Sequence, residues 1–482
     1  MRRAFPLVLG AATLALGCAS TSPEPAFQEV SAMVERRMGH GVKWNQGGPE
    51  DRKVAEAIHM KLSGVLTLDA AVEIALLQNR GLLATYEELA VSQADLVQAG
   101  LLKNPTFSVG VTTAEADRLD PNLVFGIAQD FFDLLMIPAR KRIARAQLQA
   151  AELRVGDAIL TLASEVRAAF FEVLGAMQIA EMRRAVTGAA QASAELARRQ
   201  NEAGNISDLA LSNEQAMHEQ MKLDVARADA DVLMAREKLT RLMGAWGDDT
   251  AWRVSGRLPA LPKDEIPLDH LESLAMRQRL DLAAIHRDVQ VLAYARSVMT
   301  STRWAPGINV GVEVARLTDG RIAVGPQASI ELPIFDQKRA AIARVEALLR
   351  QSEHRAAAMA IEIRSEVRST RDRVIFARRI VDHYRTVLVP LRERIVALSQ
   401  QEYDAMLLGV YQLLLAKQAE TNAYREYIEA VRDYWVARSD LERAVGGKLD
   451  RNVAADATAA PAVPAGVSDV PSAPPPPAHH HH

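Results

Sequence analysis

The chain has 482 residues, of which 49% are hydrophobic and 24% are charged, and its formal net charge is −3. This length suits several ordinary domains or one elongated body, and the apolar content excludes a wholly disordered chain. The nearly balanced charge argues against nucleic acid as the main partner, because such proteins normally carry a basic excess.

Residues 1–17 have the pattern of a secretory signal peptide. Arg2 and Arg3 precede an apolar run that is too short to span a bilayer as a helix. Cys18, the only cysteine, follows Gly17 directly, so it cannot form an intramolecular disulfide. This arrangement resembles the lipobox of bacterial lipoproteins and predicts a covalent lipid on Cys18, with residues 18–66 as a lipid-anchored N-terminal segment. The alternative is an ordinary signal peptide with an incidental cysteine.

The body of the chain consists of two tandem copies of one unit, residues 67–243 and 268–449, joined by an equatorial linker at 244–267. Similar openings start at Leu68 and Leu268, and the segments "NPTFSVGV" and "APGINVGV" follow at corresponding places. Basic helix starts come next, "ARKRIARAQ" and "QKRAAIARVE". Such self-similarity predicts two copies of the same order of elements.

Each unit is predicted to contain one long helix flanked by two short ones. We expect helices at 68–101, 139–203 and 205–243 in the first unit, and at 268–299, 338–403 and 411–445 in the second. The long helices would reach about 100 Å at 1.5 Å per residue, and Pro390 should kink the second one. Helices of this length indicate a rod or tube, although an antiparallel coiled coil without a lumen fits the same pattern.

Two stretches alternate with a period of two and predict β-hairpins at 105–130 and 306–331. Their length and their apolar-out, polar-in pattern are typical of outer-membrane barrel strands. Pro326 lacks a backbone donor and is expected to mark a bulge or bend. The predicted membrane-facing residues are Phe107, Val109, Val111, Phe125, Ile127, Ile308, Val310, Val312, Ile322, Val324 and Ile330.

Four strands cannot close a barrel, and open edges in lipid would leave backbone groups unsatisfied. The hairpins would therefore have to be pooled between subunits, giving eight strands from two protomers or twelve from three. The competing interpretation is a small soluble sheet that caps a coiled coil.

The chain resembles the TolC-type outer-membrane efflux factor family, in its lipoprotein branch, over residues 67–449. The resemblance rests on the repeated helix openings, the strand entries, the basic helix starts and the hairpin tip "AGNISDLALSNEQ" at 203–215. It implies a mainly α-helical homotrimer with a long helical tunnel in the periplasm and a twelve-stranded barrel in outer-membrane lipid. It also implies two partners, a periplasmic adaptor (membrane fusion) protein and an inner-membrane transporter.

By the same resemblance, the tips of the helical hairpins form the periplasmic entrance of the tunnel. Where many relatives carry acidic residues after the second tip, this chain has Gln412 and Leu415, so the sequence does not support an acidic ring there. Asp208, Glu402 and Asp404 are either such acidic positions or solvated tip charges. The tip and gate candidates are Gly204, Asn205, Ser207, Asp208, Met406, Gly409 and Gln412.

The sequence carries no constellation expected of an enzyme. No two histidines before the tail have metal-ligand spacing, and we find no phosphate-binding glycine loop and no nucleophile elbow. We therefore expect no catalytic residue, no metal site and no cofactor beyond the lipid. Residues 450–482 are read as a disordered Pro/Ala tail with a histidine tag. The predicted function is a passive efflux duct for metal ions or organic compounds; the alternative is a lipid-anchored periplasmic adaptor or tether without a pore.

Overall fold

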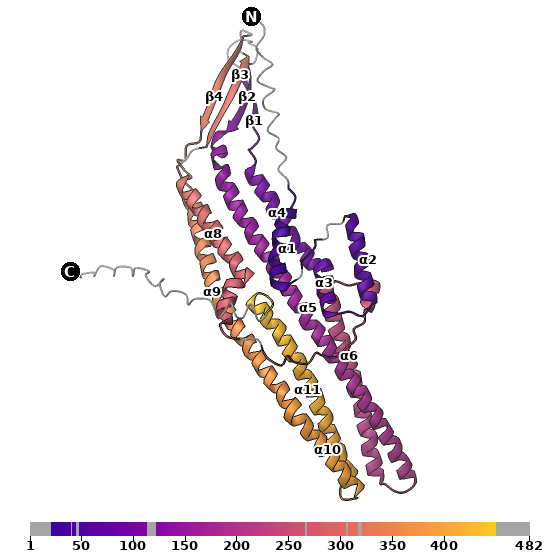
Figure 1. Cartoon of the computed structure of the whole chain (residues 1–482). Helices are drawn as coiled ribbons and strands as arrows, with labels where there is room; N and C mark the ends of the chain where they lie inside the picture. Colours follow the sequence, from indigo (N-terminus) through magenta and orange to yellow (C-terminus); the bar gives the residue numbers. More distant parts are fainter. Residues whose placement is uncertain are drawn as a thin grey trace, which may run out of the picture.

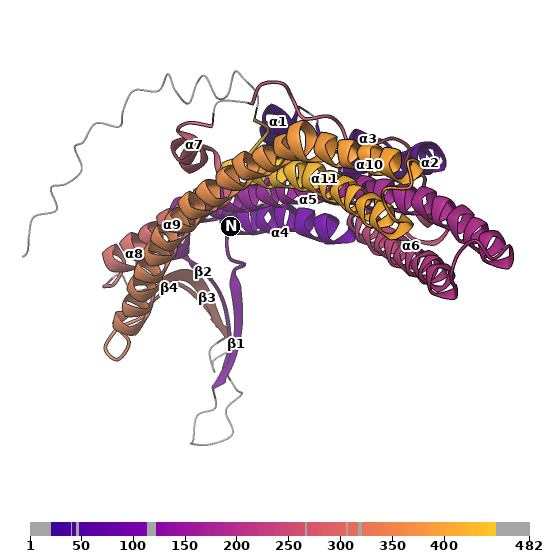
Figure 2. The same cartoon turned by 90° about the horizontal axis from the view of Figure 1, so that it is seen from below.

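The computed structural model describes residues 21–39, 41–44, 48–112, 122–265, 268–304, 307–316 and 321–449. It is an elongated, mainly helical molecule with one small sheet at one end and two helical hairpin tips at the other (Figure 1). Seen from below, the helices form a curved layer (Figure 2).

The elements of the two halves follow each other in the same order. An N-terminal segment with α1 (Glu24–Met38) and α2 (Pro49–Ser63) precedes them. The first half comprises α3 (Leu68–Gln78), α4 (Arg80–Gly100), β1 (Thr106–Thr112), β2 (Asn122–Asp130), α5 (Phe131–Glu202) and α6 (Asp208–Met243). After the short helix η1 (Gly247–Ala251), the second half comprises α7 (Leu271–Gln278), α8 (Leu280–Ser301), β3 (Ile308–Arg316), β4 (Ile322–Ile330), α9 (Arg339–His383), the π-helical turn η2 (Tyr384–Leu388), α10 (Val389–Asp404) and α11 (Val410–Val445).

The first short helix of each half is broken, which corrects the expectation of single helices at 68–101 and 268–299. Asn79 and Arg279 both have extended backbones between two helices. The Asn79 side chain accepts a hydrogen bond from the Leu82 amide and so caps α4, a behaviour that makes asparagine favourable at helix starts. Each break lies against the glycine that ends the last helix of its half, Gly244 after α6 and Gly446 after α11.

The long helix α5 begins eight residues earlier than the sequence suggested, at Phe131. Asp130 caps it by accepting a hydrogen bond from the Asp133 amide, and Pro138 lies inside the helix. In the second half the helical run passes through the π turn η2 immediately before Pro390. The irregularity expected at Pro390 is therefore present as a π turn, a common way for a helix to accommodate a missing donor.

The four strands form one antiparallel sheet in the order β1-β2-β3-β4. The pairs Val109↔Phe125 and Val314↔Val324 belong to one continuous row across the sheet, because Phe125 also faces Val314. Pro326 pairs in register with Val312, so the expected bulge at Pro326 was wrong. A proline is tolerated there because β4 is an edge strand.

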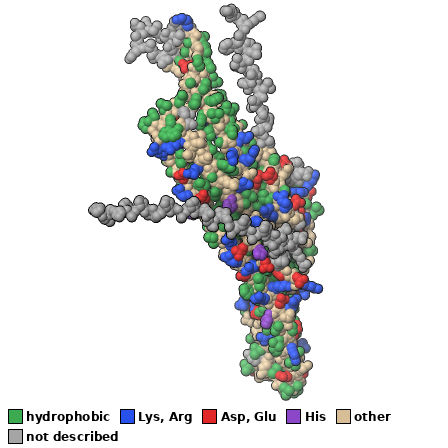
Figure 3. Space-filling view, turned by 60° about the vertical axis from the view of Figure 1, so that its left-hand side comes forward, with side chains coloured by type: hydrophobic (Ala, Val, Ile, Leu, Met, Phe, Trp, Pro, Cys, Tyr) green, Lys and Arg blue, Asp and Glu red, His purple; other side chains and the backbone are tan. Residues whose placement is uncertain are grey.

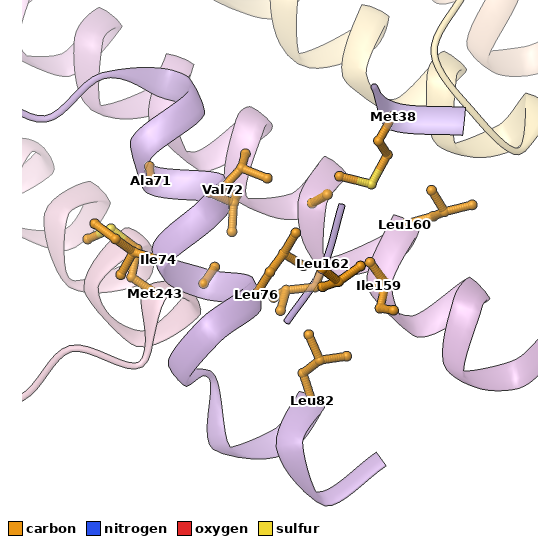
Figure 4. Close-up of a cluster of buried hydrophobic side chains, with 14 of the residues drawn as sticks. Met38, Ala71, Val72, Ile74, Leu76, Leu82, Ile159, Leu160, Leu162 and Met243 are labelled. Atoms are coloured by element: carbon orange, nitrogen blue, oxygen red, sulfur yellow. The ribbon is translucent and has the colours of Figure 1, made fainter. Parts of the chain in front are cut away.

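The main core lies at the middle of the molecule, where α1, α3, α5 and α6 meet (Figure 4). Ile74, Ile159 and Met243 are fully buried there, and Val30 of α1 joins them. The linker packs beside this core through Trp252, whose indole N–H donates to Thr240 Oγ1 at 3.0 Å. A second core joins α7, α9 and α11.

Candidate functional site

The sheet presents one apolar face to its surroundings. Phe107 is 66% exposed and Ile322 is 71% exposed, although burial of such side chains is worth about 2 kcal/mol each. The strand register places all of the predicted membrane-facing residues on this face: Phe107, Val109, Val111, Phe125, Ile127, Ile308, Val310, Val312, Ile322, Val324 and Ile330. So large an exposed apolar surface marks a place that something else covers.

The opposite face of the sheet is polar or small. Ser108, Glu313 and Gln327 lie on it, and Asn309 Nδ2 donates to Ser329 Oγ at 3.3 Å. A Cβ on Gly311 would come within 2.3 Å of the Ile127 carbonyl, so glycine permits the close approach of β2 and β3 there. The two faces thus differ sharply in polarity, as the alternating sequence indicates.

The sheet has two open edges. Strand β1 pairs only with β2, and β4 pairs only with β3, among the described residues. Because the strands alternate in direction, β4 of one copy would run antiparallel to β1 of another. Open edges next to an apolar face expose both backbone donors and acceptors, which favours pairing with further strands.

The first helical tip connects α5 to α6. Gly204 has a φ of +74°, in the left-handed region that glycine enters at little cost. Ser207 caps α6 by accepting from the Ala210 amide, and Asn201 Nδ2 donates to Asp208 Oδ1 at 3.0 Å. Asn205 completes the turn with a backbone bond to the Gln200 carbonyl.

The second tip, between α10 and α11, repeats this geometry with different residues. Met406 has a φ of +63°, so a methionine occupies the left-handed position that Gly204 occupies in the first tip. Met406 is 94% exposed, which leaves its apolar side chain in solvent at the end of the molecule. Gly409 starts α11, and the Gln412 side chain accepts from the Gly409 amide at 2.9 Å.

The acidic tip candidates have local partners. Asp404 Oδ1 accepts from Gln400 Nε2 at 2.9 Å, and Glu402 is exposed. Both Asp208 and Asp404 therefore contribute to local hydrogen bonding within one protomer. Cys18 lies outside the described residues.

A buried ionic cluster at the α7–α8 break was not predicted from the sequence. Arg279, only 8% exposed, donates to Asp281 at 2.6 Å and to Glu366 at 2.7 Å, and also reaches the Ala444 carbonyl. Arg443 pairs with the other oxygen of Glu366. The segment 271–282 also holds Glu272, Arg277 and Asp281, so no local pattern singles out Arg279. Asp281 is a local partner, but Glu366 comes from α9, far along the chain.

Two carboxyl groups of α5 lie in environments that favour their protonated forms. Burial, together with the Asp281 carboxylate, raises the pKa of Asp157 to about 6. Burial, together with Glu29 of α1, raises the pKa of Glu152 to about 7. For Arg279, burial lowers the pKa, but the hydrogen bonds to Asp281 and Glu366 outweigh it, so the pKa lies above its usual value.

Two further features bear on the site. Over the ranges that the structure describes, no helix has a long enough apolar stretch to cross a membrane. The same ranges contain no cluster of three or more His, Cys, Asp or Glu side chains arranged to hold a metal ion.

Residues 71–245 match the family model described as outer membrane efflux protein. The matched residues run from α3 to the end of α6 and so lie in the first half of the body. The resemblance inferred from the sequence is thereby confirmed. Among curated members, the chain is 27% identical over 287 residues to the cobalt-zinc-cadmium resistance protein CzcC of Cupriavidus metallidurans. The match spans 58% of this chain and 65% of that relative, just under two thirds of its length.

Solved structures share the fold of this chain. A membrane protein from Pseudomonas aeruginosa has a TM-score of 0.69 at 19% identity, with 79% of this chain and 92% of that chain covered. The Campylobacter jejuni CmeC outer membrane channel has a TM-score of 0.68 at 17% identity, with 81% and 88% covered. At these identities the comparisons establish the mainly helical fold with its small antiparallel sheet.

Proposed function

We propose that the chain is the outer-membrane exit channel of a tripartite efflux system and conducts its substrates passively. The observation that carries the proposal is the sheet, which combines an exposed apolar face, a polar face and two open edges. The family match and the fold shared with outer membrane channels support it. They do not favour the alternative of an adaptor or tether without a pore.

Three copies would supply twelve strands and close the sheet into a barrel with a lumen. Closure satisfies the edge groups of β1 and β4, which cannot hydrogen-bond in a bilayer otherwise. The helices below would then line a tunnel through the periplasm. The exposed apolar side chains of α9, such as Ile361 and Phe376, fit contacts between copies.

The membrane attachment that we propose has two parts. The apolar sheet face would meet outer-membrane lipid, and a covalent lipid on Cys18 would anchor the N-terminus. Mass spectrometry of the mature N-terminus tests the second part, and we expect an acylated Cys18. An unmodified Cys18 in the mature protein, or cleavage elsewhere, would contradict it.

The helical tips would form the closable entrance, with Gly204, Asn205, Ser207 and Asp208 in one hairpin and Met406, Gly409 and Gln412 in the other. We propose that a periplasmic adaptor and an inner-membrane transporter engage this end. CzcC is named for resistance to cobalt, zinc and cadmium, so divalent metal ions are the first substrates to test, followed by organic compounds.

Disulfide cross-linking tests barrel closure. We would pair Ser108→Cys on β1 with a cysteine at Ala323, Gly325, Gln327 or Ser329, the polar-face positions of β4. Because β1 and β4 lie at opposite edges of one sheet, a disulfide forms only between copies. We expect a ladder ending at a trimer for at least one pair, and a dimer endpoint would correct the strand number to eight.

Planar-bilayer recordings test conduction itself. We expect the purified protein to conduct ions once substitutions at the tips open the entrance. If the cross-linked trimer of every tip variant fails to conduct ions, the proposed channel is contradicted. Cleavage of β1 by protease in membranes would contradict it as well.

A further inference from the structure

Basic side chains gather on the helix ends beside the sheet. They belong to the α4–β1 connection, to α5, to the α8–β3 connection and to the start of α9, so both halves contribute. In Figure 3, Lys and Arg side chains lie next to hydrophobic ones below the sheet. We define this basic collar as Lys103, Lys141, Arg142, Arg303, Lys338 and Arg339.

An apolar belt lies between the collar and the strands. Phe335 is fully exposed and Trp304 is 58% exposed in the single protomer. Exposed aromatic side chains of this kind suit the boundary of a bilayer. The belt consists of Leu102, Leu135, Trp304, Leu332, Ile334 and Phe335. It continues the apolar face of the sheet towards the helices.

Direct contacts fix the collar close to the belt in both halves. The Lys141 side chain packs 3.3 Å from where a Cβ on Gly100 would stand, just before the belt residue Leu102. Lys338 Nζ donates to the Thr302 carbonyl at 3.2 Å, two residues before Trp304. The Arg303 guanidinium lies 4.8 Å from the centre of the Trp304 ring. Lys103 is an exception, because it lies directly before β1 and pairs with Asp130 at the end of β2. For the other collar residues, the order from the strands is apolar surface, apolar belt and cations.

Five of the six collar cations have no carboxylate partner among the described residues. Two of these have other partners, since Arg142 donates to Tyr294 Oη and Lys338 to the Thr302 carbonyl. Lys141 and Arg339 are exposed and make no salt bridge there, and Arg303 Nε is buried without a hydrogen-bond partner. By contrast, Lys103 pairs with Asp130 and Asp133, each at 3.3 Å. Lys141 and Arg339 are thus exposed and unpaired, whereas the buried Nε of Arg303 is closed to an external anion and only the rest of its guanidinium can meet one.

We propose that the basic collar binds the phosphate groups of anionic phospholipids in the leaflet nearest the helices. This inference rests on the proposed function, because it requires the sheet to cross a bilayer. An apolar surface followed by unpaired cations matches the order of acyl chains and headgroups, since long Lys and Arg side chains extend to the interface while their stems contact apolar groups. Juxtamembrane cations attract anionic lipid in the same manner.

Trp304 provides a local readout of the lipid beside the collar. We would reconstitute the full chain into phosphatidylethanolamine vesicles that contain phosphatidylglycerol, with bromine on the acyl chains of one lipid or the other at equal mole fraction. The Trp304 signal is the tryptophan fluorescence of the unsubstituted protein minus that of the Trp304→Phe variant. We expect stronger quenching by brominated phosphatidylglycerol, and a smaller excess at high salt because screening weakens the attraction.

The test variant is the triple substitution Lys141→Gln, Arg303→Gln and Arg339→Gln. It should remove most of the excess quenching by phosphatidylglycerol and keep quenching by brominated phosphatidylethanolamine, which reports that the sheet remains inserted. The matched control removes three exposed cations of α6, α9 and α10 that lie farther along the helices and make no side-chain hydrogen bond or salt bridge among the described residues: Arg241→Gln, Arg364→Gln and Arg394→Gln. The control variant should keep the excess quenching by brominated phosphatidylglycerol.

The outcomes separate this inference from the proposed function. Equal quenching by the two lipids, in a protein that conducts, overturns the inference alone. Equal loss in the test and control variants also overturns it, because general charge would then explain the effect. No quenching by either lipid together with no conductance overturns both the inference and the channel.

Discussion

At the scale of single residues, two glycines set how the halves of the molecule bend. Gly244 and Gly446 end α6 and α11 with φ values of +69° and +93°. A Cβ on Gly244 would stand 2.8 Å from the Gln78 carbonyl oxygen, and one on Gly446 would stand 3.2 Å from the Gln278 carbonyl oxygen. Both glycines therefore allow a left-handed turn at the end of a helix, and both let that turn pack closely against the break in the short helix.

Gly244→Ala should destabilise the protein by at least about 1–2 kcal/mol, the cost of a left-handed conformation for a residue with a Cβ. The contact with Gln78 adds to this cost. Gly188→Ala is the matched control, because its Cβ would meet nothing within 4 Å inside α5, and it should be neutral or stabilising by up to about 1 kcal/mol. Thermal unfolding in detergent measures both; equal midpoints for the two variants would contradict the packing argument.

Glu152 gives a prediction for pH. Its pKa of about 7 lies above that of an exposed glutamate, so between about pH 4.5 and 7 the folded state binds more protons than the unfolded state. The free energy of unfolding should therefore fall as the pH rises through this range. Glu152→Gln should stabilise the protein at pH 8, by on the order of 1–3 kcal/mol, and change little at pH 4.

Thermal midpoints of the wild type and the variant at both pH values test this prediction. Comparing the two proteins cancels other titrating groups, including Asp157 with its pKa of about 6. A variant whose midpoint differs from the wild type equally at pH 4 and pH 8 would show that folding does not raise the pKa of Glu152.

At the scale of elements, the two long helices are built differently. Helix α5 runs for 72 residues without a π turn, whereas η2 interrupts the corresponding run of the second half before Pro390. Tyr384, the first residue of η2, donates to Glu426 at 2.9 Å, and Tyr424 donates to Glu393 in α10 beyond the turn. These bonds link the two arms of the second hairpin, and the irregular turn makes η2 the place where we expect it to bend.

Pro390→Ala restores a backbone donor inside the helix and should regularise η2. We expect slower amide hydrogen exchange in η2 and in the second tip, because bending there becomes costlier. Pro138→Ala in α5 is the control and should leave the exchange of the second tip unchanged. Unchanged exchange of η2 in Pro390→Ala would contradict its role as a bending point.

At the scale of the whole molecule, polarity is arranged along one long axis. The sheet with its apolar face lies at one end, the buried cores lie at the middle, and the exposed tips lie at the other end (Figure 1). A soluble monomer would gain nothing from exposing the face that contains Val324. The same surface is favourable in contact with acyl chains, because apolar groups there leave water.

Adjacent positions on β4 distinguish the two faces of the sheet. Val324→Arg places a charge on the apolar face and should cost about 2–4 kcal/mol near the middle of a bilayer, so insertion and trimer yield should fall. Ala323→Arg places the charge on the polar face and should keep insertion while shifting ion selectivity towards anions. Vesicle flotation and bilayer recordings measure these effects; equal loss for both variants would contradict the assignment of the faces.

The elements with a strong periodicity were predictable from the sequence. The alternation in 104–113 and 305–315 placed β1 and β3, and long runs without proline placed α5 and α9. Boundaries were less accurate, since Asp130 starts α5 upstream of Pro138 and Asn79 breaks a helix that looks continuous. Capping by a single side chain decided these helix boundaries, and a single residue is a weak signal in a sequence.

The sequence by itself determined the face of each strand, the presence of the long helices and the resemblance to outer-membrane efflux proteins, because periodicity and repetition are properties of the chain alone. It also located the tips, where the exchange of glycine for Met406 keeps the same backbone turn. Only the tertiary structure decided which distant charges meet, as Arg279, Glu366 and Arg443 do, and which cations beside the sheet stay unpaired. Such contacts depend on how helices far apart in sequence pack, and no local pattern encodes that geometry.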